Sequence, residues 1–138
     1  MREAVTRALT GTPVVAAYLL GSRAAGTAGA ESDTDIACLL PRGVEGSLGL
    51  LAELTTRLAD AGVPAPDVHV LNETPLAFQA EAVLRGQRLY SSDDEARVGY
   101  EVYVLTHYLD FEPILTLQYR LQRQRLARGE SLARPSGR

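Results

Sequence analysis

The sequence predicts an α+β domain of α/β-like character, with a small mixed β-sheet and helices packed on one face of it. Two observations carry this prediction. Short apolar or alternating segments typical of strands recur along the chain, and segments with the apolar period of a helix lie between them. A length of 138 residues with 46% hydrophobic content fits one globular domain. We expect residues 1–128 to form this domain and residues 129–138 to be a flexible tail.

The first half of the chain predicts two helices and two strands. Residues 2–9 suit a short amphipathic helix, which Gly11 ends. The apolar run at 14–20 predicts a buried strand, and the run at 35–40 predicts a second one. Ser47 is a suitable N-cap for the following helix, whose apolar residues recur with a period of 3.6.

The second half begins with a branched-rich segment at 67–72, which predicts a third strand. Thr74 and the proline after it predict a helix through Leu84, followed by an extended piece. Ser92 and the acidic residues after it form a capping box that begins a long C-terminal helix. Pro113 should kink or interrupt this helix, because proline lacks an N–H and clashes with the preceding turn. The apolar stripe of the helix consists of Val98, Val102, Leu105 and Leu109.

Composition and charge exclude several classes of function. The formal net charge of -3 gives no basic footprint, so we expect no direct nucleic-acid substrate. The longest apolar run, residues 14–20, is too short to span a bilayer, and the N-terminus resembles no secretory signal. We therefore expect a cytoplasmic protein without a membrane partner. The single cysteine, Cys38, lies in an apolar run, which favours a buried and inert thiol.

A phosphate- and metal-binding pattern follows the first predicted strand. Gly21 and Ser22 form a turn whose backbone N–H groups and hydroxyl suit phosphate oxygens. Asp33 and Asp35 are two residues apart at the start of the next strand, so their side chains point to the same face. Two unpaired carboxylates about 4 Å apart would repel by roughly 4 kcal/mol at an effective dielectric of about 20. A divalent cation resolves that repulsion, and nearby phosphates favour Mg²⁺.

This pattern resembles the motif of the minimal nucleotidyltransferases of the DNA-polymerase-β-like superfamily: Gly-Ser, about ten residues, then Asp-x-Asp, with a third acidic residue on a later strand. Asp67 matches that third residue. The resemblance implies the nucleotidyltransferase fold, ATP as substrate and one or two Mg²⁺ ions. It also implies catalytic and metal-binding roles for Asp33, Asp35 and Asp67, and phosphate contacts from Gly21, Ser22 and Arg23.

Segments further along the chain are similar to the MNT antitoxins of HEPN-MNT toxin-antitoxin pairs, over roughly residues 14–125. They are Asp67-Val-His-Val-Leu-Asn72, Pro75, Leu84-Arg-Gly-Gln-Arg-Leu-Tyr90 and Tyr108-Leu-Asp-Phe-Glu-Pro113. That similarity implies an antitoxin that transfers AMP to a tyrosine of its HEPN ribonuclease partner, in a hetero-oligomeric complex. Two alternatives stay open: a non-catalytic antitoxin that binds its toxin sterically, and nucleotidyl transfer to a small molecule.

The residues leave two further assignments open. His69 shares a strand face with Asp67, and we interpret it as a neighbour of the site because nucleotidyl transfer does not require an imidazole. Aromatic residues near the C-terminal arginines are typical both of a half-buried helix face and of a protein interface. The candidate partner-binding residues are Tyr100, Tyr103, Tyr108, Phe111 and Tyr119.

Overall fold

The computed structural model describes residues 1–21 and 33–127, and beyond Asp110 it describes only the side chains of Arg120, Leu121 and Gln124. The chain divides into two compact units, Met1–Leu105 and Thr106–Arg138. The predicted tail at 129–138 lies outside the described residues, as do Ser22 and Arg23 of the predicted phosphate loop. The first unit contains all the strands described below.

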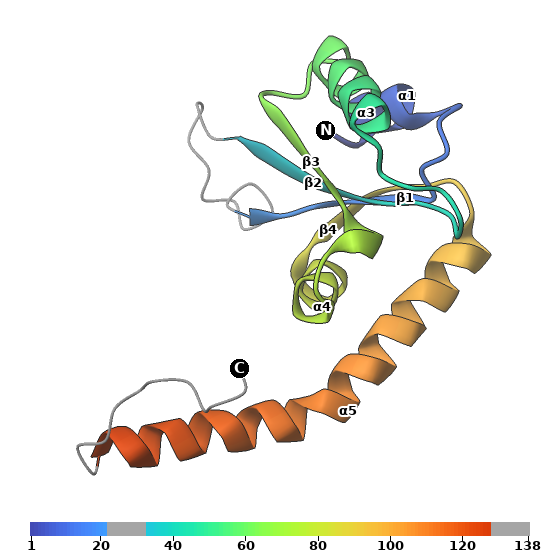
Figure 1. The fold of residues 1–138 in the computed structure, drawn as a ribbon. Coiled ribbons are helices and arrows are strands. Elements are labelled where there is room, and N and C mark those ends of the chain that lie inside the picture. Colours follow the sequence, from blue (N-terminus) through green and yellow to red (C-terminus); the bar gives the residue numbers. More distant parts are fainter. Residues whose placement is uncertain (22–32, 128–138) are drawn as a thin grey trace. The chain divides into compact units, whose positions relative to one another are not determined.

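A mixed four-stranded sheet forms the centre of the first unit, with the strand order β3-β2-β1-β4 (Figure 1). β1 is antiparallel to both of its neighbours, whereas β2 and β3 are parallel and are joined through a helix. This confirms the predicted small mixed sheet, in which the extended piece predicted after the helix at Leu84 is the fourth strand. The strands are β1 at Ala16–Leu19, β2 at Thr34–Leu39, β3 at Pro66–Val70 and β4 at Gln87–Ser91.

Helices cover both faces of this sheet, so the expectation of helices on one face is wrong. α1 and α3 pack on one face, and α4 packs against the other (Figure 1). Successive side chains of the two central strands point to opposite faces of the sheet, and nearly all of them are buried. Each face of the sheet therefore needs helices that cover it. The helices are α1 at Arg2–Leu9, α3 at Leu48–Asp60, the 3-10 helix η1 at Leu71–Glu73, α4 at Leu76–Arg85 and α5 at Asp94–Ala127.

Strand alternation separates the core into two clusters. Ile36 and Cys38 of β2 face α1 and α3, while Ala37 and Leu39 of the same strand face α4. Cys38 is fully buried, as the sequence predicts, and burial raises the pKa of its thiol to about 12. Asp35 has the parity of Ala37 and Leu39, so its side chain belongs to the α4 face of the sheet.

Local capping signals place most helix starts correctly. The Ser47 hydroxyl accepts a hydrogen bond from the Leu50 N–H at 3.1 Å, which confirms the predicted cap of α3. α5 begins where expected, but its cap is Asp93, whose carboxylate accepts from the Ala96 N–H at 3.0 Å. Ser92 instead donates to the Val14 carbonyl at 2.9 Å. Thr74 likewise donates to a carbonyl behind it, so α4 begins without a side-chain cap.

The apolar stripe of α5 does not face the sheet. Val98 and Val102 are 47% and 58% exposed, whereas Val104 is fully buried and Arg97 is only 8% exposed. The inward side of the helix is largely polar. Arg97 donates to the Glu101 carboxylate at 3.0 Å and to the Ser91 hydroxyl at 3.0 Å.

The same Glu101 carboxylate accepts a hydrogen bond of 2.6 Å from the hydroxyl of Tyr18, which is buried in β1. Burial, and then the contact with Glu101, raise the pKa of Tyr18 above its ordinary range. A second tyrosine, Tyr100, donates to the Gln79 side chain of α4 at 2.7 Å. Hydrogen bonds therefore attach the first turns of α5 to both β1 and α4.

α5 is a single helix from Asp94 to Ala127, so Pro113 does not interrupt it, and the predicted kink stays a prediction. Within residues 1–21 and 33–127, no helix is long and apolar enough to cross a membrane.

Candidate functional site

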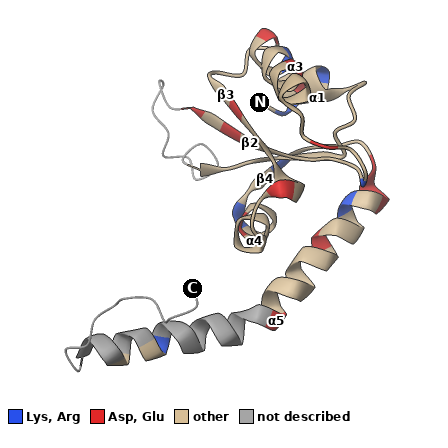
Figure 2. Ribbon diagram, in the orientation of Figure 1, with Lys and Arg blue, Asp and Glu red and all other residues tan. Residues whose placement is uncertain are grey.

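Two of the three predicted catalytic aspartates lie directly opposite each other. β2 and β3 pair in parallel, and the register places Asp35 of β2 against Asp67 of β3. Both side chains emerge on the α4 face of the sheet, because Val68 and Val70 of β3 belong to the opposite cluster. Figure 2 shows acidic residues on adjacent parts of these two strands.

His69 lies between the two carboxylates. Its Nε2 atom is 3.4 Å from Asp35 Oδ1 and 3.5 Å from Asp67 Oδ2. Ligand atoms of Asp35, Asp67 and His69 all lie within 4.8 Å of one another, and all three side chains are partly exposed. On the face that it shares with Asp67, the histidine thus contacts both acids rather than merely neighbouring one of them.

Gly21 closes one side of this cluster. Its φ of +68° lies in the left-handed region, which glycine adopts without a steric penalty. A Cβ atom at this position would lie 3.0 Å from Asp35 Oδ2, closer than ordinary packing allows. The preceding residue is fixed as well, because the Leu20 N–H donates to the Asp35 carbonyl at 2.9 Å. The predicted phosphate turn therefore begins in contact with a predicted metal ligand.

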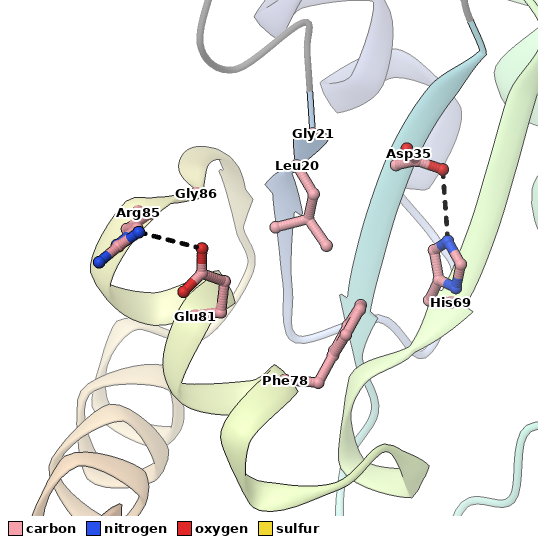
Figure 3. A pocket seen from close by; sticks show the side chains of 8 residues that line it. All are labelled: Leu20, Gly21, Asp35, His69, Phe78, Glu81, Arg85 and Gly86. Carbon is pink, nitrogen blue, oxygen red and sulfur yellow. Dashed lines mark hydrogen bonds and ion pairs between the residues drawn. The ribbon is translucent and has the colours of Figure 1, made fainter. Parts of the chain in front are cut away.

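A pocket of about 580 Å³ opens beside the cluster, a size typical of small-molecule sites. Figure 3 shows its lining side chains, among them Asp35 and His69 of the sheet, which point toward each other, and Phe78 of α4. The Phe78 and His69 rings are 5.8 Å apart and tilted by 50°. The rest of the lining comes from Leu20, Gly21, Glu81, Arg85 and Gly86.

The α4 residues of this pocket were not predicted as site residues. Arg85 and Glu81 form an ion pair of 3.7 Å one helical turn apart, and both are largely exposed. In the sequence they are an ordinary i, i+4 pair on a helix surface, so no local signal distinguishes them. They line the pocket because α4 covers the face of the sheet that carries Asp35.

The other predicted site residues have different positions. Asp33 is exposed, directly precedes β2 and is not part of the described three-residue cluster. Ser22 and Arg23 lie outside the described residues. These positions leave the proposed roles of all three residues as predictions.

The five candidate partner-binding aromatics also differ from one another. Tyr100 uses its hydroxyl inside the fold, and burial raises its pKa above its ordinary range. Tyr103 is 58% exposed, and Tyr108, in the second unit, is half-buried. The side chains of Phe111 and Tyr119 lie outside the described residues.

The donor set suits a divalent cation with phosphate groups nearby. Two carboxylates and an imidazole nitrogen converge on one point, and the pocket beside them leaves space for further ligands. A cation bound among these ligand atoms would also offset the repulsion between the two carboxylates, which lie close together on neighbouring strands.

Several solved structures have the same fold. The crystal structure of a toxin-antitoxin with AMP-PNP matches with a TM-score of 0.62 at 23% identity, over 91% of this chain and 93% of that chain. The toxin-antitoxin MntA-HepT matches with a TM-score of 0.56 at 20% identity, over 91% of each chain. The complex of tri-AMPylated Shewanella oneidensis HEPN toxin with MNT antitoxin matches with a TM-score of 0.50 at 20% identity, over 92% of this chain and 84% of that chain.

A search of curated proteins found no match. The family model described as polymerase beta, nucleotidyltransferase matches residues 3–95, which include the whole sheet and the cluster of Asp35, Asp67 and His69. Because that match spans well over half of the sequence, the chain belongs to the polymerase beta nucleotidyltransferase family.

Proposed function

We propose that this protein is an antitoxin that transfers AMP from ATP to a tyrosine hydroxyl of a HEPN ribonuclease toxin, and thereby neutralises the toxin. The observation that carries the proposal is the pair Asp35 and Asp67, opposed on neighbouring strands beside a pocket that begins at Gly21. Family membership supports nucleotidyl transfer. Similar folds in complexes with AMP-PNP and with a tri-AMPylated HEPN toxin support ATP and a protein acceptor.

The transfer is a displacement at the α-phosphorus of ATP. The tyrosine oxygen forms a bond to that phosphorus, the bond to the oxygen bridging the β-phosphorus breaks, and pyrophosphate leaves. Asp33, Asp35 and Asp67 hold the metal, and Asp67 also accepts the hydroxyl proton, directly or through a second metal. One or two Mg²⁺ ions supply charge neutralisation when bound. Gly21 lets the phosphates approach the backbone, and Ser22 and Arg23 add phosphate contacts.

The pocket suits the rest of the nucleotide. Leu20 and Phe78 provide an apolar wall on which a nucleobase packs, and Arg85 provides a cation for phosphate oxygens. Arg85 pairs with Glu81 only on an exposed surface, so releasing it to a phosphate costs little.

The toxin docks on the outward side of α5 within the first unit, in a hetero-oligomeric complex in the cytoplasm. Three side chains on this surface are each about half exposed: Val98, Val102 and Tyr103. Neighbouring exposed apolar side chains do not stabilise an isolated domain, but they are typical of a surface that binds another protein. The solved complexes with a similar fold are toxin-antitoxin pairs, so we assign this surface to the toxin rather than to a second copy.

Steric neutralisation is the second candidate function, and the same exposed surface favours it, because docking alone could block a toxin. In that case the three aspartates would be dispensable for neutralisation. Transfer to a small molecule has no comparable observation in its favour, since the second described pocket, which Val15, Leu39 and Tyr103 help to line, contains none of Asp35, Asp67 and His69.

Incubation with labelled ATP, Mg²⁺ and the purified HEPN partner separates the two. Wild type should label the toxin, whereas the combination of Asp33→Ala with Asp35→Ala should not. Asp67→Asn should lower the transfer rate by about 10²–10⁴-fold, the usual contribution of a general base, while retaining ATP binding. If the double variant neutralises the toxin without labelling it, neutralisation occurs by steric binding instead.

A second experiment tests the docking surface. Val102→Asp should weaken the complex by roughly tenfold or more, measured by titration of the toxin. Leu48→Asp is the matched control, because Leu48 is 87% exposed at the start of α3 and lies outside the proposed surface. Equal affinities of the two variants would remove α5 from the interface.

A further inference from the structure

We propose that His69 is a metal ligand and that it makes the site select Mn²⁺ over Mg²⁺. The inference rests on the proposed function, in which Asp35 and Asp67 hold the divalent cation. It assigns the histidine a role in cation selectivity, which the carboxylates alone do not provide.

The first argument is the position of one atom. His69 Nε2 lies 3.4 Å from an Asp35 oxygen and 3.5 Å from an Asp67 oxygen. Two ligands of one ion lie at most about 4.2 Å apart, twice a bond of about 2.1 Å. Both distances are within that limit, so a cation held by either carboxylate is within reach of the imidazole nitrogen.

The second argument is how the ring is held. The Phe78 ring of α4 packs against the imidazole at 5.8 Å, and the alternation of β3 sends His69 to the same face as Asp67. A packed ring loses little further rotamer entropy when its nitrogen binds an ion. The strand, the register and the aromatic contact therefore all aim Nε2 at the space between the acids.

The third argument is the chemistry of the donor set. Mg²⁺ prefers oxygen ligands in a near-ideal octahedron and gives up its waters reluctantly. First-row transition ions accept imidazole nitrogen as well as carboxylate oxygen, and Mn²⁺ also suits phosphate oxygens. An imidazole added to two carboxylates therefore favours Mn²⁺ over Mg²⁺, by more than the carboxylates alone would.

Titration of the whole protein with Mn²⁺ or Mg²⁺, followed by calorimetry and by the electron paramagnetic resonance of free Mn²⁺, tests this assignment. Wild type should bind Mn²⁺ more tightly than Mg²⁺ by about tenfold or more, on the scale of known ligand-shell effects. His69→Ala should lose about that factor for Mn²⁺ and change Mg²⁺ binding less than about twofold. His69→Gln, which keeps a polar side chain, should lose the same preference and guards against a folding defect in the alanine variant.

Glu81→Gln is the matched control. It removes a carboxylate that lines the same pocket but is not part of the cluster, so the preference for Mn²⁺ should persist. An unchanged ratio of the Mn²⁺ and Mg²⁺ affinities in both His69 variants would overturn the proposal. Tighter Mn²⁺ binding by the variants than by wild type would overturn it as well, because His69 would then compete with the ion for the two carboxylates.

The two proposals fail separately. A wild type without preference between the ions that still labels the toxin overturns the role of His69 and leaves adenylyl transfer standing. A wild type that prefers Mn²⁺ through His69 but labels no toxin overturns adenylyl transfer and leaves the ligand assignment standing.

Discussion

Substitution of Gly21 by alanine should damage the site far more than the fold, and Gly11→Ala provides the comparison. Both glycines have a left-handed backbone, with φ of +68° and +86°. An L-residue in that region costs about 1–2 kcal/mol, so each variant should lose a similar free energy of unfolding. At about 4 °C per kcal/mol, both melting temperatures should fall by about 4–8 °C.

The two positions differ in what the new methyl group meets. At Gly21 it would lie 3.0 Å from Asp35 Oδ2, whereas at Gly11 no atom lies within 4 Å. Gly21→Ala must therefore move the Asp35 carboxylate by a few tenths of an ångström, and outer-shell changes of this kind typically cost about 10–100-fold in metal affinity. Gly11→Ala should leave metal affinity and adenylyl transfer unchanged.

The assay combines thermal unfolding with Mn²⁺ titration and toxin labelling on both variants. Similar melting temperatures with a loss of metal affinity only in Gly21→Ala would support the contact with Asp35. The reasoning would be refuted if both variants lost metal affinity equally, because instability alone would then explain the loss. Wild-type affinity in Gly21→Ala would refute it as well.

Three further predictions concern the core. Tyr18→Phe removes a hydrogen bond to the carboxylate of Glu101 and should lower the free energy of unfolding in urea by about 2 kcal/mol. Tyr100→Phe removes a hydrogen bond to the neutral amide of Gln79 and should lower it by about 1 kcal/mol, and equal losses of stability in the two variants would contradict this reasoning. Burial raises the Tyr18 pKa, so above about pH 10 the unfolded chain releases a proton that the folded chain keeps, and stability should fall with rising pH, less steeply in Tyr18→Phe. Cys38 should react with a thiol reagent only as fast as the protein opens, and prompt labelling of the native protein would show that it is accessible.

Local signals were sufficient for most of the elements and for part of the site. The Ser47 cap and the apolar run of β1 depend on residues that are neighbours in sequence, so their structures could be predicted without the fold. The aspartates of β2 and β3 could be identified as acids of one site from the resemblance. Their direct opposition depends on the register of a parallel pair, which no local pattern fixes.

The parts that could not be predicted depend on which face each helix covers. Phe78 and Arg85 are ordinary residues of an amphipathic helix until α4 packs on the side of the sheet that carries Asp35. Which side of α5 faces the sheet could not be predicted for a related reason. Hydrophobic periodicity assumes that the apolar side of a helix packs inward, but here buried hydrogen bonds of Arg97 and Glu101 determine the inward side.

That polar inner side has a consequence for how firmly α5 is oriented. Apolar surfaces tolerate rotation or sliding of a helix, because one methyl group substitutes readily for another. The bonds of Glu101 to Tyr18 of β1 and of Arg97 to Ser91 of β4 have fixed directions, and turning the helix by one residue would break both at once. These bonds therefore fix the rotation of the first turns of α5 about the helix axis. They keep Val98 and Val102 facing outward, although the polar groups that make the bonds lie on the opposite, inward side of the helix.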